Sequence, residues 1–475
     1  MSTAIWWVRR DLRLKDNQAL TEAVSSSVSI IPVFISDPKL VGSSRVSPIR
    51  LAFLYQGLSE LDLALRKRGS QLILRQGQPV DVLRQMMAET GASMVFAEAD
   101  FSPYARQRDD QVSRAVPLKL VGGPCISHPE AVLKNDGSPY IVYSPYMRAW
   151  KSLYRLESNQ LLPIPDSIAT PDRVKSDFVI DEDHLSTSLE FGAGVAAAQD
   201  TLMDFVSSTG GDIYQYAEGR NKLDLDGTAK LSPYLRFGMI SARECVLAAQ
   251  EAIHRASDEH SRDSAETWLN ELIWREFFIS ILYYFPSVLK ESFRKEYRNM
   301  RWQNDDDDFL AWKEGRTGYP VVDASMRQLL ATGWMHNRGR MITASFLVKD
   351  LAIDWRWGEK FFMQHLVDGD PAANNGGWQW TAGTGTDAAP YFRIFNPILQ
   401  GKKFDPQGNF VKQWLPKLSE VPTKYIHTPW EMPTTLQEQS GCIIGKDYPQ
   451  PIVDHKFARN RILDIYGTAR QSSGE

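Results

Sequence analysis

The sequence predicts an α/β amino-terminal domain, built on a Rossmann-like parallel sheet and joined by a long linker to an all-α domain. Over the first 130 residues, short apolar runs alternate with helical stretches, which is the pattern of parallel strands and crossover helices. From 131 to 200 this periodicity fades into sequence rich in Pro, Ser and Asp, which is typical of a connector. Beyond 201 long amphipathic stretches dominate. We therefore expect domains at 1–130 and 201–475 with a linker at 131–200.

The expected strands are short runs rich in apolar and β-branched residues, at 4–8, 29–35, 71–75, 93–99 and 118–121. Helical stretches at 48–69 and 79–91 supply crossovers. No GxGxxG follows the first strand, whose exit is the charged turn RRDLRLKDN, so an ordinary dinucleotide site is not expected there. Ligands should still favour the carboxyl ends of the strands.

Composition excludes several classes of protein. With 43% hydrophobic and 24% charged residues among 475, the chain can bury sizeable cores and is not disordered overall. The net charge is -4, so a nucleic acid would have to meet a local basic patch. Cys125, Cys245 and Cys442 form no CxxC pair, which argues against a disulfide framework or a thiolate zinc site and favours a reducing cytosol. We expect no export signal and no membrane span.

The carboxyl half contains most of the tryptophan, with nine of the 14 indoles between 268 and 380. Amphipathic stretches at 245–255, 264–285 and 321–350 predict helices. The run Asp305 to Asp308 is interpreted as a solvated surface loop, and we expect no metal site there.

Two helical segments combine charged and aromatic side chains. In WLNELIWREFF, Trp268, Glu271 and Trp274 or Arg275 share one face, although a core helix with a salt-bridged Glu and Arg would have the same pattern. In WMHNRGRMITASF, Asn337 and Met341 share a face, and the flanking Arg338 and Arg340 could hold an anion. His336 alone is more often structural than catalytic.

The segment DGDPAANNGGWQW at 368–380 is read as a functional loop. It packs carboxylates, amides, glycines and indoles into thirteen residues, which indicates a flavin or nucleobase pocket. The segment DGTAKLS at 226–232 is expected to open a helix with the hydroxyls of Thr228 and Ser232, either to receive a phosphate or simply to cap the helix.

Taken together and in this order, these segments resemble the DNA photolyase and cryptochrome family, specifically its class I cyclobutane pyrimidine dimer photolyases. The resemblance runs from WWVRRDLRLKDN through TAKLS, WLNELIWREFF, TGYPVVDASMRQL and TGWMHNRGRM to DGDPAANNGGWQW and FRIFNP. It implies that the helical domain binds FAD, with FADH⁻ as the functional form. It also implies light-driven repair of dimers in damaged DNA, a carbon–carbon lyase reaction.

The resemblance implies two sets of flavin contacts. The ribityl and phosphate contacts are Tyr216, Thr228, Ala229, Lys230, Leu231 and Ser232, and the contacts around the ring are Trp268, Asn337, Arg340, Asp368, Asp370 and Asn374. Two positions depart from the commoner family pattern. Ala229 replaces a serine and so lacks a hydroxyl. Gly339 stands where a larger residue is usual, and we expect the glycine to lower the stability of that helix by about 1 kcal/mol.

The resemblance also implies the lesion-binding residues, which are Glu271, Trp274, Arg275, Asn337, Arg338, Met341 and Trp380. Plant cryptochromes replace the two lesion-stacking indoles, and (6-4) photolyases carry a second histidine where this chain has Asn337. Trp302, Trp355 and Trp378 match the family's electron relay to the flavin, although spacing alone cannot order them.

An antenna chromophore is expected in the amino-terminal domain. Folate-binding members carry Asn-Glu where this chain has Tyr104 and Ala105, whereas Asp37, Arg50 and Asp100 resemble the deazaflavin-binding members. We therefore favour 8-hydroxy-5-deazaflavin, with folate, another flavin or no antenna as alternatives.

We expect a monomeric cytoplasmic enzyme that joins the nucleoid when it binds DNA containing pyrimidine dimers. A cryptochrome-type blue-light receptor is the first alternative, and a flavin-free nucleotide-binding or structural helical protein is the second.

Overall fold

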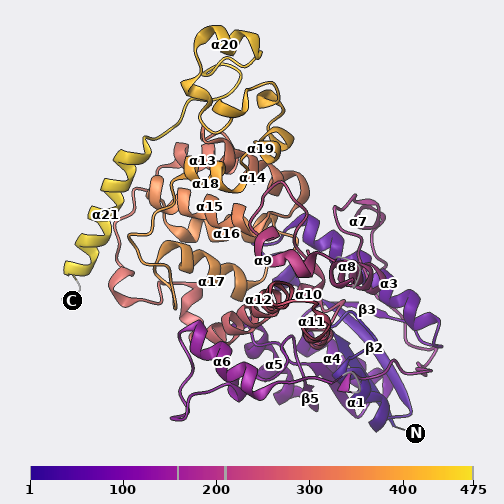
Figure 1. Cartoon of the computed structure of the whole chain (residues 1–475). Helices are drawn as coiled ribbons and strands as arrows, with labels where there is room; N and C mark the ends of the chain where they lie inside the picture. The colour runs from indigo at the N-terminus through magenta and orange to yellow at the C-terminus, as the bar shows by residue number, and fades with distance from the viewer. Residues whose placement is uncertain (1, 158–159, 208–210, 473–475) are drawn as a thin grey trace. The chain divides into compact units, whose positions relative to one another are not determined.

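The computed structural model describes residues 2–157, 160–207 and 211–472, which form two compact units (Figure 1). Unit 1 comprises residues 1–216, 229–286 and 367–372, and unit 2 comprises 217–228, 287–366 and 373–475. Unit 1 therefore combines the expected α/β domain and linker with three stretches from the expected helical domain, at 201–216, 229–286 and 367–372. The predicted domain boundaries stay a prediction.

Unit 1 contains a five-stranded sheet in the order β3-β2-β1-β4-β5, with every neighbouring pair parallel. The five expected strands are confirmed, with ends that differ by one or two residues. They are β1 (Thr3–Val8), β2 (Ser29–Ser36), β3 (Ile73–Gln76), β4 (Met94–Glu98) and β5 (Leu118–Val121). In the central pairings Ile5 lies opposite both Ile31 and Val95.

Apolar side chains on both faces of β1 are buried, which explains why this strand reads as a continuous apolar run. Ile5 and Trp7 lie in a core that also contains Leu83 and Met86 of α4 and Val112 of α5. The helices around the sheet appear in indigo and purple in Figure 1. They are α1 (Gln18–Ser26), α2 (Pro38–Val41), α3 (Pro48–Arg66), α4 (Pro79–Thr90) and α5 (Pro103–Ala115).

The segment interpreted as a linker is folded onto unit 1. It contains α6 (Tyr143–Leu153), α7 (Glu182–Ser186) and the start of α8 (Val195–Val206). Its backbone bonds to the sheet domain, where Ile30 N donates to Ala169 O at 2.8 Å, and Val174 lies in the sheet's core. The segment thus contains helices and contacts the sheet domain, while its role as a linker stays a prediction.

The other helices of unit 1 precede or carry the residues that were expected to bind ligands. They are α10 (Ser232–Phe237), α11 (Ala242–Arg255) and α12 (Glu259–Tyr284), while the short α9 (Tyr216–Gly219) crosses the boundary between the units. Side chains cap the two long helices, because Ser241 accepts from Glu244 N and Asp258 accepts from Ser261 N.

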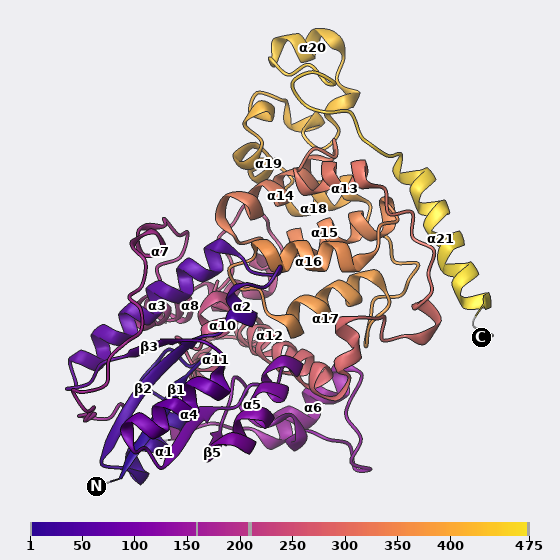
Figure 2. The same ribbon diagram turned by 180° about the vertical axis from the view of Figure 1, so that it is seen from behind.

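Unit 2 is helical over its described residues (Figure 2). Its core includes Trp312, Phe346, Trp355, Phe362 and Trp378. A π-helical turn at Phe346–Asp350 follows α15. The main helices are α13 (Asp306–Lys313), α14 (Pro320–Thr332), α15 (Asn337–Ser345), α16 (Trp355–His365), α17 (Pro371–Ala382), α18 (Pro397–Phe404), α19 (Asn409–Trp414), α20 (Thr434–Gln439) and α21 (His455–Ser472).

The acidic run at 305–308 lies on the surface but is not a loop. Asp305 caps α13 by accepting from Asp308 N at 2.9 Å, and the next three aspartates form the first turn, where negative charge favours the positive end of the helix dipole. No helix among the described residues is long and apolar enough to span a membrane.

Candidate flavin and lesion site

Ser232 and Asp368, both assigned to the flavin, are bonded to each other in unit 1. Ser232 Oγ donates to Asp368 Oδ2 at 2.6 Å, and Arg236 Nε donates to Gly369 O at 2.8 Å. The helix α10 begins at Ser232 and not at Thr228 as expected, and no side chain caps its first turn. The preceding residues form a bend in which Lys230 adopts a φ of 46°. This bend leaves its backbone outside the regular hydrogen bonds of a helix.

Asp370 lies in a half-buried charge network that begins at the exit of the first strand. Arg10 Nη2 is 2.6 Å from Asp370 Oδ2, and Arg10 Nη1 is 3.5 Å from Asp100 Oδ2. Burial opposes ionisation of Asp370, but the charges of Arg10, Arg236 and Arg275 outweigh it and lower its pKa to about 2. Asp370 is therefore a carboxylate at neutral pH.

The three expected antenna residues lie near the carboxyl end of the sheet but do not share one partner. Asp37 accepts from the Tyr104 hydroxyl and from Lys39 N. Asp100 pairs with Arg10. Burial lowers the pKa of Arg50 to about 10, while the charges of Asp368 and Asp370 act in the opposite direction. Arg50 and Asp100 are thus associated with the 368–370 segment, whereas Asp37 is associated with Tyr104.

A cavity of about 680 Å3 lies in unit 1 beside β5 and α5. Phe101, His128 and Tyr283 line it and meet edge to face, with ring centroids 4.9 to 6.0 Å apart. Arg106 lies 4.1 Å above the ring of Tyr283. Asp100 is the only expected antenna residue in the described lining. The cavity is large enough for a planar chromophore and was not foreseen.

The helix α12 presents two kinds of indole. Trp268 is 4% exposed and packs against Phe205 at 5.1 Å, whereas Trp274 is half-buried and stacks on Tyr143. Glu271 is half-buried as well. Arg275 donates to the carbonyls of Pro124 at 2.6 Å and Leu235 at 3.3 Å, so its guanidinium ties α12 to two other segments.

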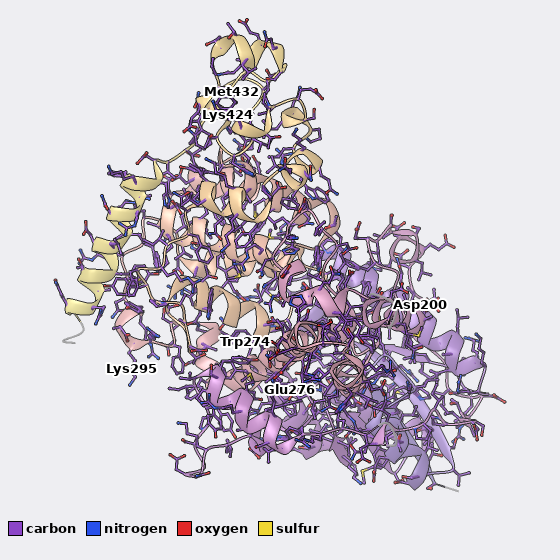
Figure 3. The ribbon with its side chains drawn as sticks, in the orientation of Figure 1. Asp200, Trp274, Glu276, Lys295, Lys424 and Met432 are labelled. Carbon is purple, nitrogen blue, oxygen red and sulfur yellow. The ribbon has the colours of Figure 1, made fainter. Side chains whose placement is uncertain are left out.

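Glu276 is a buried carboxylate on α12, two residues beyond Trp274, that the sequence pattern did not reveal (Figure 3). It is 5% exposed, and its two oxygens accept from Ile126 N at 2.5 Å and from Trp150 Nε1 at 2.7 Å. Burial raises its pKa to about 7 despite both hydrogen bonds. Its place in the sequence next to Trp274 and Arg275 could have drawn attention to it. Its hydrogen-bond partners could not be foreseen, because they lie about 125 to 150 residues away in sequence.

In unit 2, α15 begins at Asn337 and is capped by the His336 side chain, which accepts from Arg338 N at 3.0 Å. Asn337 Nδ2 lies 4.0 Å from Met341 Sδ, so the two side chains share a face as their spacing indicates. The helix is continuous through Gly339. A Cβ there would lie 2.9 Å from Ser325 Oγ, so the glycine permits close packing of α15 on α14.

Arg338 and Arg340 differ in their surroundings. The guanidinium of Arg338 lies 4.3 Å above the Phe404 ring, and burial together with the charges of Arg220 and Arg393 lowers its pKa to about 10. These three arginines concentrate positive charge, which suits a phosphate. Arg340 donates to Met335 O at 2.8 Å.

The segment expected as a loop at 368–380 is helical from Pro371 onwards, as part of α17. Asn374 Nδ2 donates to Glu359 O at 3.0 Å and to Glu359 Oε1 at 3.1 Å. Since both bonds use the nitrogen, the amide oxygen of Asn374 remains as an acceptor. Trp380 is half-buried.

The three expected relay indoles belong to one cluster in unit 2. Trp378 and Trp355 are 2% and 1% exposed, and the half-buried Trp302 packs against the same core. A Cβ on Gly358 would lie 2.1 Å from Trp378 Cη2, so this glycine makes room for the indole. The indole nitrogen of Trp378 has no hydrogen-bond partner among the described residues.

The predicted flavin and lesion sets are divided between the units. Unit 1 contributes Tyr216, Ala229 to Ser232, Trp268, Glu271, Trp274, Arg275, Asp368 and Asp370; unit 2 contributes Thr228, Asn337, Arg338, Arg340, Met341, Asn374 and Trp380. No group of His, Cys, Asp and Glu that could hold a metal occurs among the described residues.

Comparisons with known proteins match the whole chain. Residues 4–166 match the model for DNA photolyase, and residues 268–468 match the model for the FAD binding domain of DNA photolyase. The deoxyribodipyrimidine photo-lyase of Escherichia coli is 40% identical over 99% of this chain and 100% of its own.

Solved structures give the same result. A class III photolyase from Agrobacterium tumefaciens superimposes with a TM-score of 0.92 at 36% identity, covering 99% of this chain and 98% of its own. A Sulfolobus tokodaii photolyase with two FAD molecules gives 0.83 at 32%, covering 98% and 100%. A Synechocystis cryptochrome gives 0.88 at 30%, covering 98% and 99%.

Proposed function

The chain belongs to the DNA photolyase family, and on that premise we propose that it repairs cyclobutane pyrimidine dimers in DNA with blue light and FAD. The observation that carries this proposal is the burial of the indoles. Trp274 and Trp380, at lesion-binding positions, are half-buried, whereas Trp355 and Trp378, at relay positions, lie in a core. A ligand needs indoles that it can reach, whereas the inner members of a relay should be shielded from water.

The lesion-binding residues have roles that follow from their chemistry. A pyrimidine dimer is poorly paired, so flipping it out of the duplex costs less than flipping a normal base; photolyases are a standard example of flipping enzymes. Trp274 and Trp380 offer apolar faces to the saturated rings, and Glu271 accepts from their polar edge. Asn337 and Met341 share a face of α15 and would add a polar and an apolar contact to the lesion, while Arg338, with Arg220 and Arg393 near it, suits the DNA backbone.

The chemistry of the residues fits a bound flavin. The amide oxygen of Asn374 is an acceptor fixed by Glu359, which suits the N–H of a reduced ring, and an amide cannot titrate as Asp would. Asp368, bonded to Ser232, links the ring-binding segment to the phosphate-binding bend. When bound, FAD supplies the electron that splits the dimer and then takes it back.

Trp302, Trp355 and Trp378 would pass electrons inward to an oxidised flavin. Their membership of one core supports this role, since the half-buried Trp302 can meet an external reductant and the other two indoles are shielded from water. The relay is separate from repair, which draws its electron from flavin that is already reduced.

A second chromophore is also part of the proposal. Asp37, Arg50 and Asp100 favour 8-hydroxy-5-deazaflavin, and the two FAD molecules of the Sulfolobus tokodaii photolyase support a flavin-type antenna as the alternative. A folate is less favoured, because Ala105 is 1% exposed and has no carboxylate to hold a pterin. The cavity lined by Phe101 and Tyr283 has room for a planar ring.

One experiment separates the proposal from its alternatives. The purified protein should be yellow, with flavin absorbance, and after chemical reduction it should restore a dimer-containing oligonucleotide under blue light but not in the dark. Flavin absorbance without repair would favour a cryptochrome-type receptor. Absence of flavin, even after incubation with FAD, would contradict both. Size-exclusion chromatography on the same sample tests the expected monomer, and a cytoplasmic location stays a prediction.

A further inference from the structure

We propose that Tyr143 is a positioning residue that holds the Trp274 indole as a rigid platform for the lesion, an inference that rests on the proposed function. Tyr143 lies at the start of α6, in the segment that the sequence pattern marks as a connector. No family motif used above includes it. The inference comes from the contacts of this side chain within unit 1.

The two rings form a parallel stack. Their centroids are 3.6 Å apart and their planes differ by 6°. Aromatic pairs usually prefer offset or edge-to-face arrangements with centroids about 4.5–7 Å apart, because ring faces repel each other electrostatically. A face-to-face pair at this distance therefore requires other contacts to hold it.

The phenol hydroxyl provides the first such contact. Tyr143 Oη donates to Asn270 O at 2.7 Å, and Asn270 lies one helical turn before Trp274 on α12. The hydroxyl of Tyr143 is thus fixed by one turn of α12, and its ring lies flat on the Trp274 side chain in the next turn. Tyr143 is 7% exposed, so the stack is shielded from water on the tyrosine side.

The rest of α6 provides the second set of contacts that holds the stack of Tyr143 on Trp274. Tyr143, Tyr146 and Trp150 lie at helical spacing and are buried. The Tyr146 ring packs on Phe277 of α12 at 5.3 Å, and Trp150 Nε1 donates to the buried Glu276 at 2.7 Å. One face of α6 therefore contacts α12 both before Trp274 in the sequence, at Asn270, and after it, at Glu276 and Phe277.

The remaining neighbours of Trp274 leave part of it accessible. Phe277 meets the indole at 79° and Phe278 at 33°, with centroids 5.6 and 5.4 Å away, and the indole is still half-buried. A lesion would thus meet an indole whose orientation is already set. Binding then does not have to order that side chain. Because less conformational entropy is lost on binding, the affinity for the lesion is higher.

The test replaces Tyr143 and measures affinity for DNA with and without a dimer. Tyr143→Leu should weaken binding to the dimer-containing oligonucleotide by about threefold to tenfold, the cost of ordering one side chain. Binding to the undamaged oligonucleotide should not change, and neither should the repair yield at saturating DNA. Tyr143→Phe keeps the ring and should retain most of the affinity. Tyr143→Met is a second ring-free variant in case the leucine variant does not fold.

Tyr154 offers a matched control. It is a half-buried tyrosine just after α6 that contacts Trp150 at 5.2 Å, so Tyr154→Leu makes the same change away from the indole and should leave affinity unaltered. Combining Tyr143→Leu with Trp274→Ala should add nothing to the loss caused by Trp274→Ala alone, because the platform is then absent.

The outcomes are distinguishable. If Trp274→Ala weakens dimer binding but Tyr143→Leu and Tyr143→Met do not, the inference about Tyr143 is wrong and the proposed function stands. Tighter dimer binding by these variants would also overturn it, because Tyr143 would then cover the face that the lesion needs. If Trp274→Ala itself leaves dimer binding intact, the proposed lesion site fails.

Discussion

Trp274 and Trp378 are both tryptophans, but their surroundings in the structure are opposite. Trp274 is half-buried on α12 and held by a stacked tyrosine, whereas Trp378 is 2% exposed in a core that also contains Trp312 and Phe362. The first is positioned by a few directional contacts and the second by close packing on all sides. The difference indicates which indole a ligand could reach and which is shielded from ligands and water by its neighbours.

The largest effect is expected in the buried region. Trp378→Phe removes the readily oxidised indole and leaves an aromatic ring of similar shape, so the protein should fold and bind FAD with only a small cavity cost. Photoreduction of oxidised flavin with an external reductant should nearly cease, while repair by chemically reduced enzyme should stay close to that of the wild type.

Trp312→Phe is the matched control for this experiment. Trp312 lies in the same core, with its ring centroid 6.1 Å from that of Trp378, but has no expected place in the relay. Normal photoreduction in Trp378→Phe would remove that indole from the relay. Loss of repair with FAD still bound would assign it to the lesion step instead.

A smaller effect is expected at the accessible indoles. Replacing Trp274 or Trp380 by Ala should weaken binding of dimer-containing DNA by about 1–3 kcal/mol, the usual value of one stacked base. Affinity for undamaged DNA, which depends mainly on phosphate contacts, should change little. Titration of both oligonucleotides at one salt concentration measures the difference. Equal losses on both would show that the indoles do not recognise the lesion.

The smallest effect on DNA binding is expected at Glu276, whose hydrogen bond to Trp150 helps to hold α6 on α12 and which bears on stability instead. The folded pKa of Glu276 is about 7, above its ordinary value of 4.5, so the folded chain holds this proton more tightly than the unfolded chain does. The resulting stability is fully present below pH 4.5 and is lost as the pH rises through 7. Between pH 5 and 8 the free energy of unfolding should therefore fall by about 2–3 kcal/mol on this account.

Urea unfolding of the wild type and of Glu276→Gln, measured across this range, tests the assignment. The glutamine cannot ionise, so the variant should show a flatter pH dependence. Identical profiles for the two proteins would mean that Glu276 does not titrate in this range.

The fold could largely be predicted from the sequence, because strand and helix periods are local properties. The five strands and the long helices followed from apolar spacing alone. The helix α17 did not, since Asn and Gly have low helix propensity; its polar residues are fixed by distant groups, as when Asn375 Nδ2 donates to Val288 O at 2.9 Å. The helix α6 is short and follows a stretch without periodicity.

The candidate site was less predictable, because its decisive contacts join distant parts of the chain. Arg10 and Asp370 are 360 residues apart, and no local sequence pattern around either residue indicates that the two form a pair. Glu276 and Trp150 are 126 residues apart. Resemblance to a family supplies residue types at such positions, but the ion pairs and hydrogen bonds that join them become visible only in three dimensions.

The pair of Arg10 and Asp370 also bears on how the chain is made. Residues 367–372 belong to unit 1 although the chain on both sides of them belongs to unit 2. During synthesis, the half-buried guanidiniums of Arg10 and Arg236 cannot pair with this carboxylate until some three quarters of the polypeptide has been made. Unit 1 is therefore incomplete until residue 372 has been added, by which point the first two segments of unit 2 have already been synthesised.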